Sequence, residues 1–228
     1  MPPVTKLPLT EPWRRRLFIP AYAVADAARY ANAKPQTVAY WHKGGRPGPA
    51  LPGKRPGVRL SYMQLAEVAF VATFRQLGVT LPRLRNAREY LAQTFNSEFP
   101  FAEYRLRTEG VHVLLDLEEI EPDSELPRLI IADRGGQMAW EPMVEERFME
   151  FDYEHELAVR WHVAGRTSPI IIDPRIAFGA PTINGIATWV IKGRAIAGES
   201  IADIGRDFNL AADDVTEALA FEGIPLAA

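Results

Sequence analysis

Residues 22–42 read YAVADAARYANAKPQTVAYWH, a stretch that predicts two short helices in the N-terminal part of the chain. Asn32 tolerates the left-handed conformation that ends a helix, and Pro35 suits the first turn of the next one. Val38 and Trp41 would then face inward together. Apolar residues at three- and four-residue intervals predict one buried helical face before the turn: Val24, Ala27, Ala28 and Ala31. The stretch therefore predicts a helix-turn-helix.

Charge is divided unevenly along the chain. The first sixty residues carry 11 Lys and Arg against only Glu11 and Asp26, a net charge of +9. The other 168 residues carry 15 basic against 27 acidic residues, a net charge of −12. An asymmetry of this kind indicates that one end contacts a polyanion while the rest has another role.

The second helix of a helix-turn-helix enters the major groove of DNA and reaches base edges. Its outward side chains here are Gln36, Thr37 and Tyr40. Glutamine pairs with adenine, and threonine contacts a thymine methyl group or a phosphate. The alternative is a helical hairpin inside a core with a solvated basic face. Charge and motif together favour DNA binding, with phosphate contacts expected from Lys34, Lys43, Arg46, Lys54, Arg55 and Arg59.

Two irregular segments flank this motif. Residues 1–20 are polar and rich in proline and predict an extended arm. The arm carries Arg14, Arg15 and Arg16, which would enter a minor groove. Residues 43–59 form a basic loop rich in Gly and Pro that has the size of a wing.

Further helices follow the loop. Ser61 and Gln64 form a capping box that opens a helix running to about Leu77, and Thr80 caps another that ends near Phe95. The crowded apolar residues of the first of these predict burial on two sides.

Residues 22–91 resemble the MerR-type winged helix-turn-helix. The resemblance is carried by the strand-like Leu60-Ser61-Tyr62 after the loop and by the turn Leu77-Gly78-Val79-Thr80-Leu81. It implies a dimeric repressor or activator, usually with an effector end. The loop is longer and richer in proline than the family pattern, and no long coiled-coil heptad follows. The chain has no cysteine, which excludes metal sensing by thiolates.

The middle region, residues 100–165, has a net charge of −10 and predicts a strand-rich unit of four or five strands. Residues 129–132 and 137–140 predict a hairpin, and a short helix is expected near residues 142–151. Alternating apolar residues predict two further strands: Val111, Val113, Leu115 and Leu117, and then Leu157, Val159, Trp161 and Val163. Aromatic residues that would line an effector pocket are Trp140, Phe148, Phe151, Tyr153 and Trp161.

The C-terminal region predicts a strand at residues 170–172 and three helices, at about 188–197, 200–207 and 213–222. Its turn-rich sequence DPRIAFGAPTING (173–185), followed by GESIADI (198–204), resembles a small domain of unknown function found in bacterial antitoxins. These VapB-like antitoxins are paired with PIN-domain ribonuclease toxins. Many members have Thr-Arg where this chain has Ile186-Ala187, which puts any role of that arginine in doubt here.

The tail also has the pattern of a helix-turn-helix, but its acidic helices would repel phosphate. The residues concerned are Asp203, Asp207, Asp213, Asp214 and Glu217. A dimer or partner surface is the favoured interpretation.

Catalytic and metal-binding motifs are absent from the sequence. His42, His112, His155 and His162 are scattered and form no ligand motif. The carboxylates of residues 116–125 do not have the spacing of a calcium-binding loop, and Pro122 interrupts them. A solvated loop, or a surface that contacts a basic toxin, is therefore favoured over a metal site. The carboxylates are Asp116, Glu118, Glu119, Glu121, Asp123 and Glu125, and Glu145, Glu146, Glu150, Glu154 and Glu156 would also face a toxin. We expect no metal, no cofactor and no enzymatic activity.

The sequence therefore predicts an α+β protein with three domains. These are a MerR-like winged helix-turn-helix with a basic arm (1–99), an acidic strand-rich middle (100–165) and a small helical, helix-turn-helix-like antitoxin and dimerisation domain (166–228). The expected function is that of a cytoplasmic antitoxin. It would form a homodimer, bind the double-stranded DNA of its own operator and neutralise a PIN-domain toxin, without a membrane partner, since no apolar run is long enough to span a bilayer. The alternative is an effector-responsive regulator without a toxin.

Overall fold

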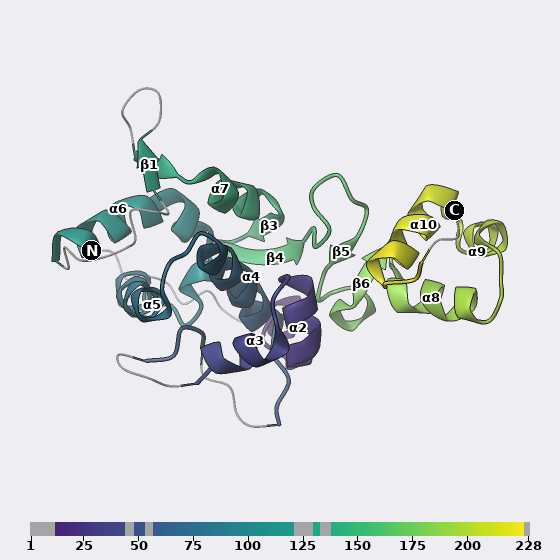
Figure 1. Ribbon diagram of the computed structural model, residues 1–228, viewed down its shortest axis with the longest axis horizontal. Coiled ribbons are helices and arrows are strands. Elements are labelled where there is room, and N and C mark those ends of the chain that lie inside the picture. The colour runs from purple at the N-terminus through teal and green to yellow at the C-terminus, as the bar shows by residue number, and fades with distance from the viewer. Residues whose placement is uncertain (1–11, 44–47, 53–56, 121–129, 133–137, 226–228) are drawn as a thin grey trace. The chain divides into compact units, whose positions relative to one another are not determined.

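The computed structural model describes residues 12–43, 48–52, 57–120, 130–132 and 138–225, which divide into two compact units. The first unit is Met1–Ala158 and the second is Val159–Ala228. Helices and antiparallel strands occur in the chain together, so the expected α+β class is confirmed (Figure 1). None of the helices in these residues is both long and apolar enough to cross a membrane.

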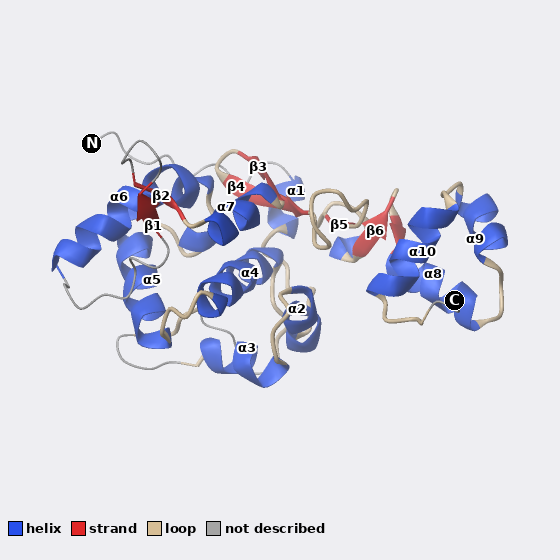
Figure 2. Ribbon diagram, turned by 45° about the horizontal axis from the view of Figure 1, so that its top comes forward, coloured by secondary structure: helices blue, strands red, loops and turns tan. Residues whose placement is uncertain are grey.

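Helix α4 (Tyr62–Gln76) lies at the centre of the first unit (Figure 2). It begins at the predicted capping box, where the Ser61 hydroxyl accepts from the Gln64 backbone N–H at 3.2 Å and the Gln64 side chain accepts from the Ser61 N–H at 2.9 Å. Almost every α4 side chain up to Phe74 is buried, which confirms burial on more than one side. Its neighbours are α2 (Val24–Tyr30), α5 (Leu81–Phe95), α7 (Pro142–Met149) and the 3-10 turn η1 (Pro100–Ala102).

Helix α6 (Tyr104–Ile120) replaces the strand predicted from the alternation at 111–117, and that prediction is wrong. Buried residues recur at helical spacing along it, at Leu106, Gly110, Val113 and Leu117. Helix α6 packs against both α5 and strand β2 (Met138–Trp140), so it buries a wide face. Over a few residues, the apolar residues of such a face can alternate with polar ones as they do in a strand.

The hairpin predicted after α6 is confirmed. Strand β1 (Ile130–Ala132) pairs antiparallel with β2, and Ile131 lies opposite Ala139. Helix α7 and the strands β3 (Phe151–Glu154) and β4 (Leu157–Trp161) follow. The short helix and the second alternating strand were therefore placed correctly.

Aromatic side chains of these elements pack on α4. The ring of Phe70 lies 5.1 Å from that of Phe148 and 5.4 Å from that of Phe151, and Trp140 lies 5.4 Å from Phe148. Trp140, Phe148 and Phe151 are all buried. Trp140 and Phe148 therefore belong to the core and do not line an effector pocket, which corrects that expectation for these two residues. Trp161, in the second unit, is also fully buried.

The second unit continues from β4 into three short strands and three helices. The five-stranded sheet has the order β3-β4-β5-β6-β7, with β5 (Ile171–Ile172), β6 (Pro181–Ile183) and β7 (Ile186–Ala187). Helices α8 (Thr188–Ile196), α9 (Ile201–Phe208) and α10 (Ala212–Phe221) lie close to the predicted ranges and pack on one another. Their shared core consists of Ile170, Ile183, Ile191, Ile204, Leu210, Val215, Ala218 and Leu219.

An unusual turn, η3 (Ala177–Gly179), connects β5 to β6. Its three residues have φ values of +45° at Ala177, +55° at Phe178 and +79° at Gly179. Positive φ is costly for residues with a side chain beyond glycine. Nevertheless the Phe178 side chain is 93% exposed, so the turn holds an aromatic ring in solvent.

Candidate nucleic-acid interface

Helices α2 and α3 (Pro35–Trp41) confirm the two short helices predicted at residues 22–42. Asn32, with φ of +50°, separates them, and the Ala33 N–H donates to the Ala28 carbonyl at 2.8 Å. Val38 is fully buried and Trp41 is 3% exposed, as predicted. The small buried side chains of α2 let the two helices approach closely: Ala27, Ala28 and Ala31.

The outward face of α3 carries the residues predicted to read DNA. Gln36 and Thr37 are exposed, and Tyr40 is 54% exposed. Lys34 and Lys43 are exposed at the two ends of the helix. The face therefore offers amide, hydroxyl and aromatic groups between two cations, a set suited to base edges flanked by phosphates.

The basic loop is described only in part. Arg59 is exposed and its guanidinium donates to the Ala21 carbonyl at 2.9 Å, beside the isolated antiparallel bridge between Tyr22 and Leu60. The strand-like segment expected at residues 60–62 is thus a single bridge, because α4 already begins at Tyr62. Arg46, Lys54 and Arg55 lie outside the described residues.

The arginine triplet is not an extended arm. Arg14, Arg15 and Arg16 belong to a short helix, α1 (Pro12–Arg16), and Arg14 is buried. The next residue, Leu17, is also buried, and its carbonyl accepts from the Met63 N–H at 3.1 Å, which ties this end of α1 to α4. Arg15 and Arg16 remain exposed. The extended prediction for residues 12–16 is therefore wrong, and residues 1–11 lie outside the described part.

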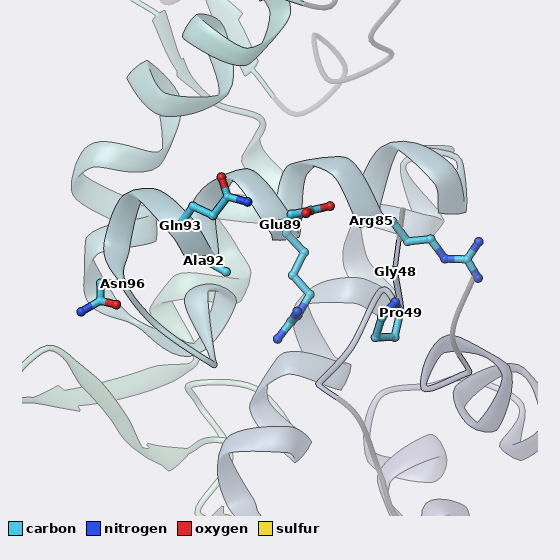
Figure 3. Close-up of a pocket in the computed structure, with 8 residues that line it drawn as sticks. Gly48, Pro49, Arg85, Glu89, Ala92, Gln93 and Asn96 are labelled. Atoms are coloured by element: carbon cyan, nitrogen blue, oxygen red, sulfur yellow. The ribbon is translucent and has the colours of Figure 1, made fainter. Parts of the chain in front are cut away.

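A pocket of about 500 Å³ lies between one face of α5 and residues Gly48 and Pro49 of the loop (Figure 3). Sequence reasoning did not identify it, because only folding places the loop against α5. The guanidinium carbon of Arg85 lies 6.0 Å from the centroid of the Tyr40 ring, which connects the pocket to α3. The α5 residues that line it recur at helical spacing: Arg85, Arg88, Glu89, Ala92, Gln93 and Asn96.

A buried carboxyl lies behind this pocket. Glu67 of α4 is fully buried, and its Oε1 accepts from the backbone N–H groups of Phe101 at 2.7 Å and Ala102 at 3.1 Å. Its Oε2 lies 3.7 Å from Nε of Arg88. Burial raises the pKa of Glu67 to about 8, although Arg88 and the two N–H groups act in the opposite direction. Glu67 thus fastens η1 to α4 while remaining largely protonated at neutral pH.

The turn motif of the second unit is held by an ion cluster. Asp173 is 1% exposed, accepts from the Arg175 guanidinium at 2.7 Å and lies 3.3 Å from Nε of Arg160. Burial alone would raise the pKa of Asp173, but the hydrogen bonds and charges of Arg175 and Arg160 outweigh it and lower the pKa. Asp173 therefore fixes the loop that leads to η3.

The acidic helices of the second unit are partly neutralised by their own arginines. Arg194 pairs with Glu199 and Asp207, and Arg206 pairs with Asp203. Large apolar side chains are nevertheless exposed on this unit, with Trp189 at 62% and Ile196 at 68% on α8.

The predicted acidic run lies mostly outside the described residues. Nothing is described for Glu121, Asp123 and Glu125, or for the side chains of Asp116, Glu118 and Glu119. Within the described ranges, no group of three or more His, Asp or Glu side chains is placed to hold a metal ion.

Comparisons with known proteins found matches to the C-terminal residues and to most of the chain. Residues 170–221 match the family model "Protein of unknown function (DUF433)". The chain is 27% identical over 227 residues to a Mycobacterium tuberculosis protein named "Putative antitoxin VapB45", covering 90% of this chain and 94% of that protein. A crystal structure of Rv2018 from Mycobacterium tuberculosis has the same fold, with a TM-score of 0.78 and 24% identity over 90% of this chain and 99% of that one. The chain is therefore similar, over 90% of its length, to an antitoxin-like protein.

Proposed function

We propose that this protein is a cytoplasmic antitoxin without enzymatic activity that neutralises a PIN-domain ribonuclease toxin and represses its own operon by binding DNA. The observation that carries the proposal is the similarity of 90% of this chain to the protein named "Putative antitoxin VapB45". The match of residues 170–221 to DUF433 supports it. The uneven charge supports the division of labour, with a basic N-terminal part for DNA and an acidic remainder for a cationic toxin.

Neutralisation is tested with the adjacent reading frame. We expect the neighbouring protein to arrest growth when it is expressed alone and the arrest to be relieved when this chain is co-expressed. The two proteins should also co-purify. Toxicity of the neighbour that this chain does not relieve would overturn the antitoxin proposal.

DNA reading is tested on α3. Gln36→Ala combined with Tyr40→Ala is expected to lower the discrimination between the operator and random duplex by roughly 1–3 kcal/mol for each base that is no longer read. Gln76→Ala with Tyr90→Ala removes the same side-chain types from α4 and α5 and serves as the control. Equal weakening of specific and non-specific binding in the α3 variant would show that α3 is not the reading helix.

The proposed protein is a homodimer, because a helix-turn-helix dimer places two reading helices about one turn of DNA apart on a pseudo-palindrome. The exposed Phe178, Trp189 and Ile196 supply apolar surface for protein contacts of this unit. Sedimentation equilibrium of the full chain measures the mass, and a monomer at micromolar concentration would contradict the dimer.

A second candidate is an effector-responsive regulator without a toxin. It is favoured by a hollow of about 500 Å³ lined by Tyr104, Phe151 and Tyr153 with Asp152, His155 and Glu156. Phe151 and Tyr153 are two of the aromatic residues that the sequence suggested for an effector. A neighbouring frame without a toxic product would favour this function.

A further inference from the structure

Two arginines, Arg85 and Arg88, line the pocket on α5. Arg85 is only 8% exposed, and its Nε finds no hydrogen-bond partner in the described part of the chain. The Nε of Arg88 is also buried without a hydrogen bond there, and it lies 3.7 Å from Oε2 of Glu67. One terminal nitrogen of Arg88 donates to the Glu98 carbonyl at 2.6 Å. Both arginines also line the same cavity, and two guanidinium groups beside one carboxylate make a cavity attractive to an anion.

The charge balance of the pocket is positive at neutral pH. Glu89 contributes one exposed carboxylate, against the two arginines. The nearest other carboxyl, Glu67, is largely protonated because burial raises its pKa to about 8, so it neutralises little of the charge on Arg88. The planar guanidinium matches the oxygen geometry of a phosphate or carboxylate.

The location of the pocket next to α3 indicates which kind of anion it binds. Arg85 lies against Tyr40 of α3, the helix proposed to enter the major groove, and Pro49 belongs to the loop that follows α3. Figure 3 shows Arg85 at the end of the α5 face that lies next to Pro49. A helix in the major groove has a phosphate backbone along each side, within about the 12 Å width of the groove.

We propose that this pocket, built by Arg85 and Arg88 of α5 opposite Gly48 and Pro49, takes a backbone phosphate of the DNA duplex to which α3 binds. The inference rests on the proposed DNA binding and adds a contact that does not read sequence. A phosphate bound at α5 sets the position of α3 along the DNA groove, because Arg85 of the pocket contacts Tyr40 of α3. The remaining polar residues of the pocket are Gln93, farther along α5, and Asn96, which caps the end of this helix.

The salt dependence of DNA binding by the full chain tests this contact. Arg85→Gln is expected to weaken binding to operator and random duplex alike and to reduce the slope of log Kobs against log salt by about 0.9, the value for one phosphate contact. Arg85→Lys keeps the charge and should keep the slope. Arg206→Gln removes an equal charge from an exposed site on α9 and is the matched control, with an unchanged slope expected.

A second variant, expected to bind DNA more tightly, shows whether the weaker binding of Arg85→Gln comes from lost charge or from misfolding. Glu89 is exposed, and Glu89→Gln removes the one carboxylate on the rim of the pocket. We expect roughly two- to fivefold tighter binding to both duplexes at low salt. Weaker binding by Arg85→Gln together with tighter binding by Glu89→Gln reports the charge of the pocket itself.

The outcomes separate this inference from the function on which it rests. If the wild-type chain binds the duplex but Arg85→Gln leaves the salt slope unchanged, the phosphate contact is refuted and DNA binding stands. If the wild-type chain binds no duplex even at low salt, the proposed function and the backbone assignment fail together. Thermal unfolding in inorganic phosphate at constant ionic strength then identifies the source: stabilisation that Arg85→Gln abolishes would assign the pocket to a free phosphate compound instead.

Discussion

Glu67→Gln is expected to make the chain more stable than wild type at alkaline pH, by roughly 1–3 kcal/mol at about pH 8.5. The folded pKa of Glu67, about 8, lies above its ordinary value of 4.5, so the folded state holds the proton more tightly than the unfolded state. The stability that this carboxyl contributes is complete below about pH 4.5 and is lost as the pH rises through 8. A glutamine oxygen accepts the same N–H groups of Phe101 and Ala102 but does not ionise.

The measurement is the difference in unfolding free energy between wild type and variant, by urea denaturation at several pH values. Other titrating groups cancel in this difference, including Glu103, whose pKa is raised chiefly by burial. Glu89→Gln, on an exposed face of α5, is the control for replacing a glutamate by glutamine in this part of the chain. Parallel curves for wild type and Glu67→Gln would show that Glu67 ionises normally in the folded protein.

Gly205→Ala is expected to destabilise the second unit by about 2 kcal/mol. Gly205 lies inside α9, and an added Cβ would stand 2.9 Å from the backbone oxygen of Leu210. The Leu210 N–H also donates to the Gly205 carbonyl at 2.8 Å, and Leu210 is part of the core, so the turn cannot move away cheaply.

Gly193→Ala on α8 is the matched comparison. Nothing lies within 4 Å of its added Cβ, and alanine favours a helix over glycine, so a gain of about 0.5–1 kcal/mol is expected. Urea denaturation followed by far-ultraviolet circular dichroism measures both variants. Equal changes of the same sign would falsify the close approach of Leu210 to α9.

Local signals in the sequence were sufficient for much of the helical architecture. The capping box at Ser61, the turn at Asn32 and the glycine after α4 act within a few residues, so the boundaries of α3, α4 and α5 follow from them. The three helices of the tail were located by the same kind of signal, such as Ser200, whose hydroxyl accepts from the Asp203 N–H at 3.1 Å.

Tertiary contacts decided what the sequence left open. The segment at 111–117 reads equally as strand or helix until α5 and β2 cover two sides of it. Three adjacent arginines suggest solvent, and only the contact between Leu17 and α4 shows that Arg14 is inside.

The candidate site also has one part that the sequence predicts and one part that depends on tertiary contacts. The outward face of α3 followed from spacing, because Val38 and Trp41 fix which side is buried. The pocket behind it did not, since its two walls, α5 and Pro49, are far apart in the chain. A buried acid such as Glu67 gives no sequence signal at all, because it lies among apolar residues that predict only a core.

The left-handed turn η3 has a consequence for engineering. Glycine or asparagine at position 178 would relax a backbone that phenylalanine occupies at a cost of about 1–3 kcal/mol. We therefore expect a selection for thermally stable variants of this chain to replace Phe178 by glycine or asparagine. If variants selected for higher thermal stability keep the aromatic residue at position 178, the exposed ring must have a function that offsets the backbone strain.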